Sequence, residues 1–280
     1  MAKLRIYSDF HNDHAQSVAK LWRPPVVGNE KEQILCLAGD LWIGTKFIEY
    51  ANSSWIMEMA ERFKYVLVCL GNHDFWPMNQ GLTILEGADK CNAMLQDRGL
   101  FNVKVLDCDT FTDPDEPDVL FVGNTLWTDM KKGDPLVMQN MTQFMSYDGQ
   151  IIYEAGPNAK HGFMRFTSQR WVATHHRHKQ YIKLIAEQNR DKKIVVITHH
   201  IPLETLIDPR YVGDESNFYY ASDLSDIYLD NPHIVLHAYG HSHYSMDTHM
   251  VNCRFINNSV GYPSESKEGR GLIKHEVIEI

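Results

Sequence analysis

The sequence has few cysteines and no long apolar run, and these two features narrow the classes of protein to which it can belong. Its five cysteines, Cys36, Cys69, Cys91, Cys108 and Cys253, are an odd number among 280 residues, and none forms a Cys-x-x-Cys pair. A disulfide framework is therefore not expected, and a reducing cytoplasm is the natural location. No apolar stretch approaches the ~20 residues of a membrane span, and the N-terminal segment lacks the apolar core of a signal peptide, so we expect no membrane partner.

Positive charge is also scarce. The chain has 27 lysines and arginines against 36 aspartates and glutamates, which gives a net charge of −9 at pH 7. Such a surface repels nucleic-acid backbones and anionic membranes unless a basic patch intervenes. The clusters Lys131-Lys132 and Arg177-His178-Lys179 are small. A nuclease acting on nucleic-acid ends is therefore a disfavoured alternative, because it predicts a basic groove.

Short apolar segments alternate with longer segments of helical periodicity. Strands are predicted at residues 4–7, 34–38, 65–70, 119–122, 194–198, 234–238, 254–257 and 272–278. Apolar residues recur every three or four positions at residues 48–59, 84–95 and 171–185, which predicts helices. This alternation is typical of an α/β protein. No linker divides residues 1–280, so we expect a single domain, with an elaboration over the functional site within residues 75–190.

Polar side chains follow five of the predicted strands at the point where each ends. They are Asp9 and His11, Gly39-Asp40, Gly71-Asn72-His73-Asp74, His199-His200 and Gly240-His241-Ser242-His243. Sites in α/β sheets lie at the carboxyl ends of strands, so we expect these residues to gather at one edge. In extended backbone Asp9 and His11 point the same way and can bind one ion; His241 and His243 can bind one ion or two neighbouring ions. Mixed oxygen and nitrogen ligands favour Mn²⁺, Fe, Zn²⁺, Ni²⁺ or Co²⁺ over Ca²⁺.

In this order, the five clusters resemble the motif set of the calcineurin-like metallophosphoesterases. One cluster alone is a weak signal, but five ordered clusters between residues 9 and 243 span most of the chain. Residues 123–129, 198–200, 221–224 and 257–262 are also similar to a branch of small, mostly uncharacterised bacterial phosphoesterases. The resemblance implies the fold, a four-layer α/β sandwich of two mixed β-sheets flanked by helices.

The resemblance also implies a role for each residue of the clusters. The implied ligands are Asp9, His11 and His243 for one metal ion and Asn72, His199 and His241 for the other, with Asp40 bridging both. His73 matches the histidine that contacts the phosphate and can protonate the leaving group. Possible substrate contacts are His175, Trp127, Asp129 and His200. For the first three of these, packing in the core or a loop stays open as the alternative, and His200 is expected near the metals without ligating.

The chain departs from the Ser/Thr protein phosphatases of this family at two positions. Those enzymes extend Gly-Asp by an aspartate that supports the catalytic histidine and an arginine that grips phosphate. Here the positions hold Ile43 and Gly44. Asp74 is a candidate replacement as the partner of His73. The missing arginine argues against a protein phosphatase.

We therefore expect an enzyme that hydrolyses small or nucleotide-like phosphate esters with two divalent transition-metal ions, Mn²⁺ first, and a metal-bridging hydroxide as nucleophile. A phosphodiesterase is preferred, because a diester needs no arginine clamp; a phosphomonoesterase is the alternative. A metal-binding scaffold is the alternative of another class, as the retromer scaffold subunit uses this fold. It predicts loss of His73 or of a ligand, and all are present. The sequence leaves the oligomeric state open.

Overall fold

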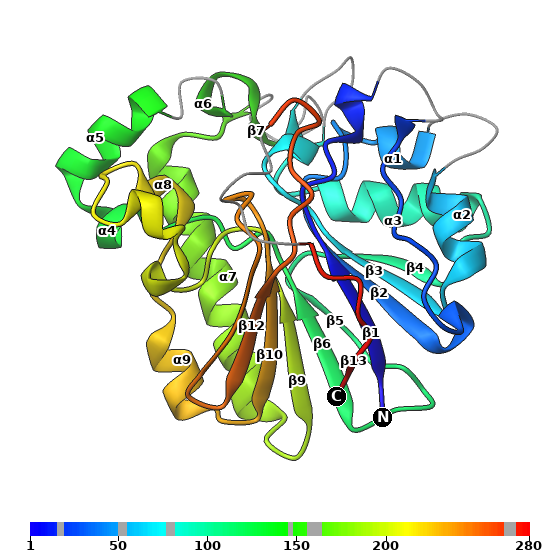
Figure 1. Ribbon diagram of the computed structural model, residues 1–280. Helices are drawn as coiled ribbons and strands as arrows, with labels where there is room; N and C mark the ends of the chain where they lie inside the picture. The colour runs from blue at the N-terminus through cyan, green and yellow to red at the C-terminus, as the bar shows by residue number, and fades with distance from the viewer. Residues whose placement is uncertain (16–19, 50–54, 77–81, 145–147, 156–163, 266–272) are drawn as a thin grey trace.

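A computed structural model describes residues 1–15, 20–49, 55–76, 82–144, 148–155, 164–265 and 273–280. Two β-sheets face each other in the middle of the molecule, and helices cover their outer faces (Figure 1). Both termini lie at the same end of the sheets, opposite to the end at which β1 finishes (Figure 1).

The first sheet has five strands in the order β13-β1-β2-β3-β4. Four of them run parallel: β1 (Lys3–Tyr7), β2 (Gln33–Ala38), β3 (Tyr65–Cys69) and β4 (Val103–Leu106). The edge strand β13 (Ile278–Glu279) pairs antiparallel with β1. Because the four parallel strands share one direction, the loops that follow them all emerge at the same edge.

The second sheet has six strands in the order β11-β12-β10-β9-β6-β5. Their bounds are β5 (Asp109–Phe111), β6 (Val119–Gly123), β9 (Lys193–Ile197), β10 (Ile234–Tyr239), β11 (Met246–Met250) and β12 (Cys253–Asn257). The four inner strands are parallel, and the edge strands β5 and β11 are antiparallel to their neighbours. Separately, β7 (Tyr153–Ala155) and β8 (Met164–Arg165) form a small antiparallel pair.

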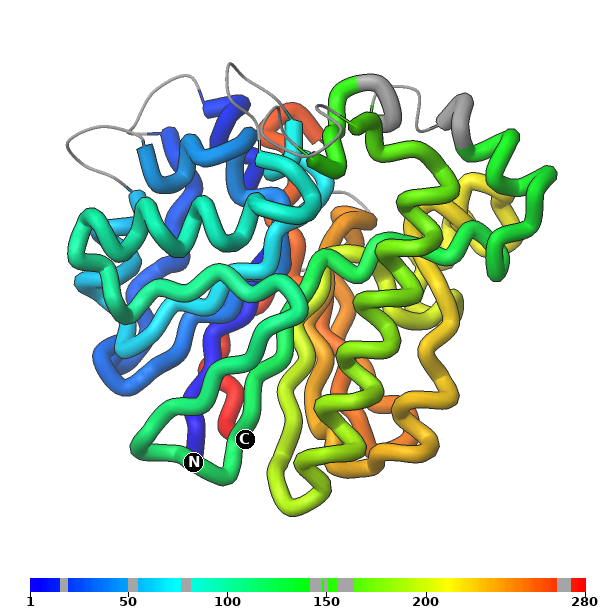
Figure 2. Tube along the Cα trace, turned by 180° about the vertical axis from the view of Figure 1, so that it is seen from behind, coloured from blue at the N-terminus to red at the C-terminus, as the bar shows by residue number. Residues whose placement is uncertain are grey.

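The helices divide between the two sheets and the end at which the parallel strands finish. Their bounds are α1 (Lys46–Glu49), α2 (Trp55–Arg62), α3 (Gly87–Asp97), α4 (Met130–Gly133), α5 (Pro135–Phe144), α6 (Asp148–Ile151), α7 (Ser168–Gln188), α8 (Asn217–Tyr220) and α9 (Ser225–Asp230). Seen from behind, α3 lies beside the first sheet and α7 along the second (Figure 2). None of the described helices is long and apolar enough to cross a membrane.

Three apolar layers hold the sheets and helices together. Between the sheets, Ile6 and Leu67 of the first sheet pack in one cluster with Val195 and Leu236 of the second. A further cluster joins the first sheet to α2 and α3, and another joins the second sheet to α7 and α9. Alternate residues of each strand therefore face two different apolar layers, as the pleat requires. The predicted four-layer α/β sandwich is confirmed.

Most of the predicted strands and helices are present, with shifts of one to three residues at their ends. Of the helix predicted over residues 48–59, α1 and α2 cover the described parts, and residues 50–54 lie outside the described residues. The strand predicted over residues 272–278 is wrong. Residues 273–277 form no strand, residue 272 lies outside the described residues, and only Ile278–Glu279 pairs with β1. The edge strand β11 (Met246–Met250) was missed, because its side chains are only half-buried and give no apolar run.

Residues 75–190, within which an elaboration over the site is expected, contain parts of the main fold as well as short additional elements. Within this range β4, β5 and β6 belong to the two main sheets, and α3 and α7 cover them. The short elements α4, α5 and α6 lie beyond the sheets, at the end where the parallel strands finish (Figure 1). The described elements α4–α6 are candidates for the expected elaboration, which stays a prediction.

The packing between the sheets predicts a large loss of stability when a side chain there is truncated. Leu67 is 0% exposed between the sheets, whereas Leu229 on α9 is 64% exposed. Leu67→Ala should lower the free energy of unfolding by about 2–5 kcal/mol, because it removes buried methyl groups and leaves a cavity. Leu229→Ala, the matched control, should change it by less than about 0.5 kcal/mol. Urea unfolding measures both, and equal losses would contradict this assignment of the core.

Candidate metal centre

Five loops meet at the carboxyl ends of strands from both sheets. Asp9 and His11 follow β1, Asp40 follows β2, and Asn72 and His73 follow β3 of the first sheet; His199 follows β9, and His241 and His243 follow β10 of the second. The backbone is not extended in these loops. Asp9, His11, Asp40, His241 and His243 all have φ between 44° and 72°, a region that costs residues other than glycine about 1–3 kcal/mol each. The expectation that Asp9 and His11 converge through extended backbone is therefore wrong, although their side chains do meet.

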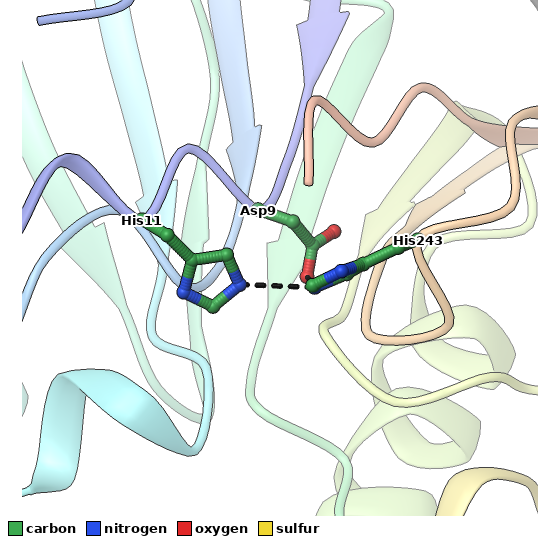
Figure 3. A group of neighbouring side chains, drawn as sticks. All are labelled: Asp9, His11 and His243. Carbon is green, nitrogen blue, oxygen red and sulfur yellow. Dashed lines mark hydrogen bonds and ion pairs between the residues drawn. The ribbon is translucent and has the colours of Figure 1, made fainter. Parts of the chain in front are cut away.

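The first group of converging side chains is Asp9, His11 and His243 (Figure 3). The Nε2 atoms of His11 and His243 are 2.9 Å apart, and His243 Nε2 lies 3.5 Å from Asp9 Oδ1. One potential ligand atom of each residue lies within 4.8 Å of the others. The three side chains can therefore surround one small cation.

The second group is Asp40, His199 and His241, and Asn72 joins it. His199 Nε2 lies 3.0 Å from Asn72 Oδ1 and 3.3 Å from Asp40 Oδ2. The same Asp40 oxygen is 3.8 Å from His11 Nε2 of the first group. Asp40 thus lies between two groups of donor atoms, which is the arrangement that a carboxylate shared by two ions requires.

Glycines make this convergence possible. A Cβ atom at Gly71 would lie 2.1 Å from Asp40 Oδ1, and a Cβ atom at Gly39 would lie 2.4 Å from His199 Nδ1. Gly39 also has φ +86°, which other residues rarely adopt. Any side chain at either position would push apart the loops that carry Asp40 and His199.

The hydrogen bonds of the histidines leave their Nε2 atoms available to a cation. His199 Nδ1 lies 2.9 Å from the Ala38 carbonyl, and His243 Nδ1 lies 2.9 Å from a Glu265 carboxylate oxygen. Both partners only accept, so the protons sit on Nδ1 and the Nε2 lone pairs point into the groups. Among the described residues, His241 Nε2 is buried without a partner. Lone pairs facing carboxylate and amide oxygens fit a divalent cation.

In the metal-free protein, protons on the histidines take the place of the cations. Burial opposes the charged form of His199, but the neighbouring Asp40 and Asp9 carboxylates outweigh it and raise the pKa of His199 to about 9. Burial likewise opposes the charged form of His243, but hydrogen bonds to Asp9 and Glu265 raise its pKa to about 10. These two rings are therefore charged at neutral pH in the metal-free protein.

A second ring of hydrogen bonds fixes the two carboxylates. Asp9 accepts the backbone N–H of His241 at 3.1 Å and the Ser259 hydroxyl at 2.6 Å. Asp40 Oδ1 accepts the backbone N–H of His73 at 2.9 Å. These contacts leave neither carboxylate free to swing away from the histidines.

Asp74 is not the partner of His73 that the sequence suggested. Its carboxylate accepts the backbone N–H groups of Gly71, Asp40 and Trp42 at 2.7, 2.9 and 3.2 Å. Burial, helped by the nearby Asp40 charge, raises the pKa of Asp74 to about 8. Asp74 therefore ties together the loops after β2 and β3 from behind the metal-binding groups.

His73 is held by two aromatic residues. Its ring stacks on Trp76 with centroids 3.6 Å apart, and its Nε2 lies 3.0 Å from the Tyr262 hydroxyl. Tyr262 also stacks on His11, with ring centroids 4.0 Å apart. Sequence reasoning assigned no role to Tyr262 or Glu265. The one signal for either residue was the position of Tyr262 at the end of the stretch 257–262.

A cavity of about 520 Å³ opens beside these groups. His73, Tyr262 and both metal-binding groups contribute to its wall, which continues along Ile201, Ile207, Asp208, Arg210, Tyr211, Ser216, Asn217, Tyr219 and Tyr220. Arg210 is bound by both carboxylate oxygens of Asp208, at 2.5–3.1 Å. The cavity therefore combines a charged end at the metal-binding groups with a wall of aromatic and aliphatic side chains.

The four residues expected as substrate contacts do not line this cavity. Trp127, His175 and His200 are buried, and His175 Nδ1 lies 3.3 Å from the Trp127 carbonyl oxygen. The His200 ring packs 4.2 Å from that of His241. The backbone N–H of Asp129 donates to the Ser222 hydroxyl at 2.9 Å. The structure therefore places Trp127, His175 and His200 in packed surroundings, with the Trp127 ring against Phe75, Phe166 and Trp171.

The raised histidine pKa values predict that cation binding releases protons. Below pH 9 the His199 ring, and below pH 10 the His243 ring, must lose a proton before Nε2 can bind a metal. Apparent Mn²⁺ affinity should therefore rise steeply from pH 6 to 8, with about two protons released per chain at pH 7. Calorimetric titration in buffers of different ionisation enthalpy counts these protons.

A matched variant tests the cause of the proton release. Glu265→Gln removes one of the charges that raise the pKa of His243, so fewer protons should be released at pH 8. The raised pKa values also affect the stability of the metal-free protein. They stabilise the fold at pH values below 6.5, the ordinary pKa of histidine, and this stabilisation is lost as the pH rises through 9 and 10. Mn²⁺ binding without proton release at pH 7 would contradict the assignment.

Comparison with known proteins agrees with this geometry. The family model described as calcineurin-like phosphoesterase matches residues 2–245. The uncharacterized protein L509 of Acanthamoeba polyphaga mimivirus is 23% identical over 287 residues, covering 95% of this chain and 93% of its own. The crystal structure of phosphopantetheinyl hydrolase from Mycobacterium tuberculosis has the same fold, with a TM-score of 0.64 and 19% identity over 94% of this chain and 90% of the other. Since the family model spans most of the sequence, the chain belongs to the calcineurin-like phosphoesterase family of metal-dependent hydrolases.

Proposed function

We propose that this protein is a dimetal phosphodiesterase acting on small or nucleotide-like phosphodiesters. The observation that carries the proposal is the charge of the cavity beside the metal-binding groups. Among its described lining residues Arg210 is the single arginine or lysine, and Asp208 already neutralises it. A phosphomonoester dianion therefore finds little positive charge beyond the metals, whereas a diester carries one charge and needs less.

In this proposal Asp9, His11 and His243 hold one ion, and Asn72, His199 and His241 hold the other, with Asp40 shared. The donor set supports Mn²⁺ first, because it mixes carboxylate, amide and imidazole ligands. Two bound divalent ions supply Lewis-acid charge to the phosphate and activate the attacking water. Glu265 orients His243, and Ser259 orients Asp9, so that their ligand atoms face the ions.

His73 is proposed as the residue that contacts the phosphate and protonates the leaving oxygen. It lines the cavity, and Trp76 and Tyr262 fix its ring from two sides. The other substituent of a diester can lie along Tyr211, Tyr219 and Tyr220, whose rings offer flat apolar surface. We also propose that residues 1–280 act as one domain, and that the protein is cytoplasmic, which its five free cysteines support.

An ester panel with Mn²⁺ tests the substrate class. The kcat/KM for bis-p-nitrophenyl phosphate should exceed that for p-nitrophenyl phosphate by at least about tenfold, the ~1.4 kcal/mol expected for a missing charged hydrogen bond. Asp208→Asn frees Arg210 and should move the ratio toward the monoester. Cyclic nucleotides, nucleotide diesters and a phosphopantetheinyl ester belong in the panel, the last because of the similar M. tuberculosis hydrolase. A preference for the monoester would favour a phosphomonoesterase instead.

His73→Ala tests the proton donor. Metal content should stay at two ions per chain, because His73 is not among the proposed ligands. Turnover of alkyl diesters should fall by about 10²–10⁴-fold, whereas turnover of p-nitrophenyl esters should fall far less, because a good leaving group needs no proton. His249→Ala, on the exposed edge strand β11, is the control and should leave both rates unchanged. Equal losses on the two ester types would assign His73 to phosphate binding alone.

A further inference from the structure

Asp148 is a buried carboxylate beside the metal-binding groups that belongs to none of them. It is the first residue of α6 and is 3% exposed. Its carboxylate accepts hydrogen bonds from Asn72 Nδ2 at 3.0 Å, from Trp76 Nε1 at 2.5 Å and from the Tyr219 hydroxyl. Three donors from two separate segments, the loop after β3 and α8, therefore share one carboxylate. Asp148 itself does not line the cavity.

The contact with Asn72 decides which end of its amide faces the metal-binding group. Asn72 Oδ1 lies 3.0 Å from His199 Nε2, and Asn72 Nδ2 faces Asp148 on the other side. A carboxylate only accepts hydrogen bonds, so the amide NH₂ must point to it. The amide oxygen, which is the atom that can ligate a metal, is thereby directed toward His199 and Asp40.

Through its hydrogen bond with Trp76, Asp148 also affects the position of the His73 ring. The Trp76 ring stacks on the His73 ring, with centroids 3.6 Å apart and planes 26° from parallel. Its indole N–H donates to Asp148 Oδ1, which fixes the rotation of the ring on which His73 rests. Among the described residues the His73 ring has no carboxylate as a hydrogen-bond partner, so the orientation of the ring depends on Trp76 and Tyr262.

We propose that Asp148 is a positioning residue that sets both the amide of Asn72 and, through Trp76, the ring of His73. The inference rests on the proposed function, because it assigns Asn72 to a metal and His73 to the phosphate. It also gives a role to the segment around α6, which lies outside both main sheets. One side chain from that segment would link the second metal to the proton donor.

Asp148→Asn tests the proposal with little change in size. The variant keeps one acceptor oxygen where the carboxylate has two, and its NH₂ group faces either the indole N–H of Trp76 or the NH₂ of Asn72. Affinity for the second Mn²⁺ should fall about 10- to 100-fold, as for other residues that orient a metal ligand. Affinity for the Mn²⁺ at Asp9, His11 and His243 should stay unchanged. At saturating Mn²⁺, kcat should fall for an alkyl diester and much less for an aryl diester, because Asp148 acts on the proton donor His73 and only the alkyl leaving group needs the proton.

Two further variants separate positioning from general stability. Asp113→Asn is the matched control, since Asp113 is also buried and binds Lys64 at 2.5 Å, at the opposite end of the first sheet. It should lower the unfolding temperature without changing either Mn²⁺ affinity. Trp76→Phe added to Asp148→Asn removes the competing indole donor, so the remaining amide oxygen can face Asn72. Affinity for the second Mn²⁺ should then recover about tenfold.

Calorimetric Mn²⁺ titration of each variant, with thermal unfolding as a check on folding, decides between the outcomes. If Asp148→Asn does not fold, Asp148→Glu, which moves the acceptor oxygens by the length of one methylene group, replaces it in the test. This variant too should weaken Mn²⁺ binding only at the second site. If the wild-type protein fails to bind two Mn²⁺ ions, the proposed function fails. If it binds two and the folded Asp148 variants bind both as tightly, only the positioning role of Asp148 is overturned.

Discussion

The structure depends on the charge balance between two buried carboxylates and the histidines that face them. Asp9 and Asp40 come from loops of the first sheet, and their partners His243 and His199 come from loops of the second. An unpaired buried carboxylate costs several kcal/mol, so neither sheet can place its acidic residue there alone. Protons on the two histidines satisfy this need in the metal-free protein, and divalent ions satisfy it in the metal-bound one. The same contacts therefore join the two halves of the sandwich and create the metal centre.

Bringing so many ligands to one point requires unfavourable backbone conformations. Five of the seven proposed ligands have positive φ, and Gly39 and Gly71 leave no room for a Cβ atom. Such strain persists only where the surroundings fix it, and here they do. Asp74 binds three backbone N–H groups of the loops after β2 and β3, and the backbone of His241 donates to Asp9. Backbone hydrogen bonds that end on Asp74 and Asp9 therefore hold these loops in their strained conformations.

The chemistry of the cavity follows from what surrounds this centre. The positions that hold an aspartate and an arginine in the protein phosphatases hold Ile43 and Gly44, and His73 is supported by Trp76 and Tyr262. Arg210 faces the cavity but is neutralised by Asp208. Phosphate charge must therefore be met almost entirely by the metals. Aromatic rings along the remaining wall support the proposed diester substrate, because they offer a surface for its second substituent.

The sequence by itself determined the fold class and the seven proposed ligands. Each ligand lies within a few residues of the end of a buried strand, so a local pattern was enough to find it, and parallel strands bring their carboxyl ends to one edge. The structure alone decided which residues orient those ligands. Tyr262 lies 189 residues from His73, and Asp148 lies 76 residues from Asn72. It also placed Trp127 and His175 in the core, with the Trp127 ring against Phe166 and Trp171. Contacts of this range depend on how loops from different sheets pack, and no spacing within the chain encodes that geometry.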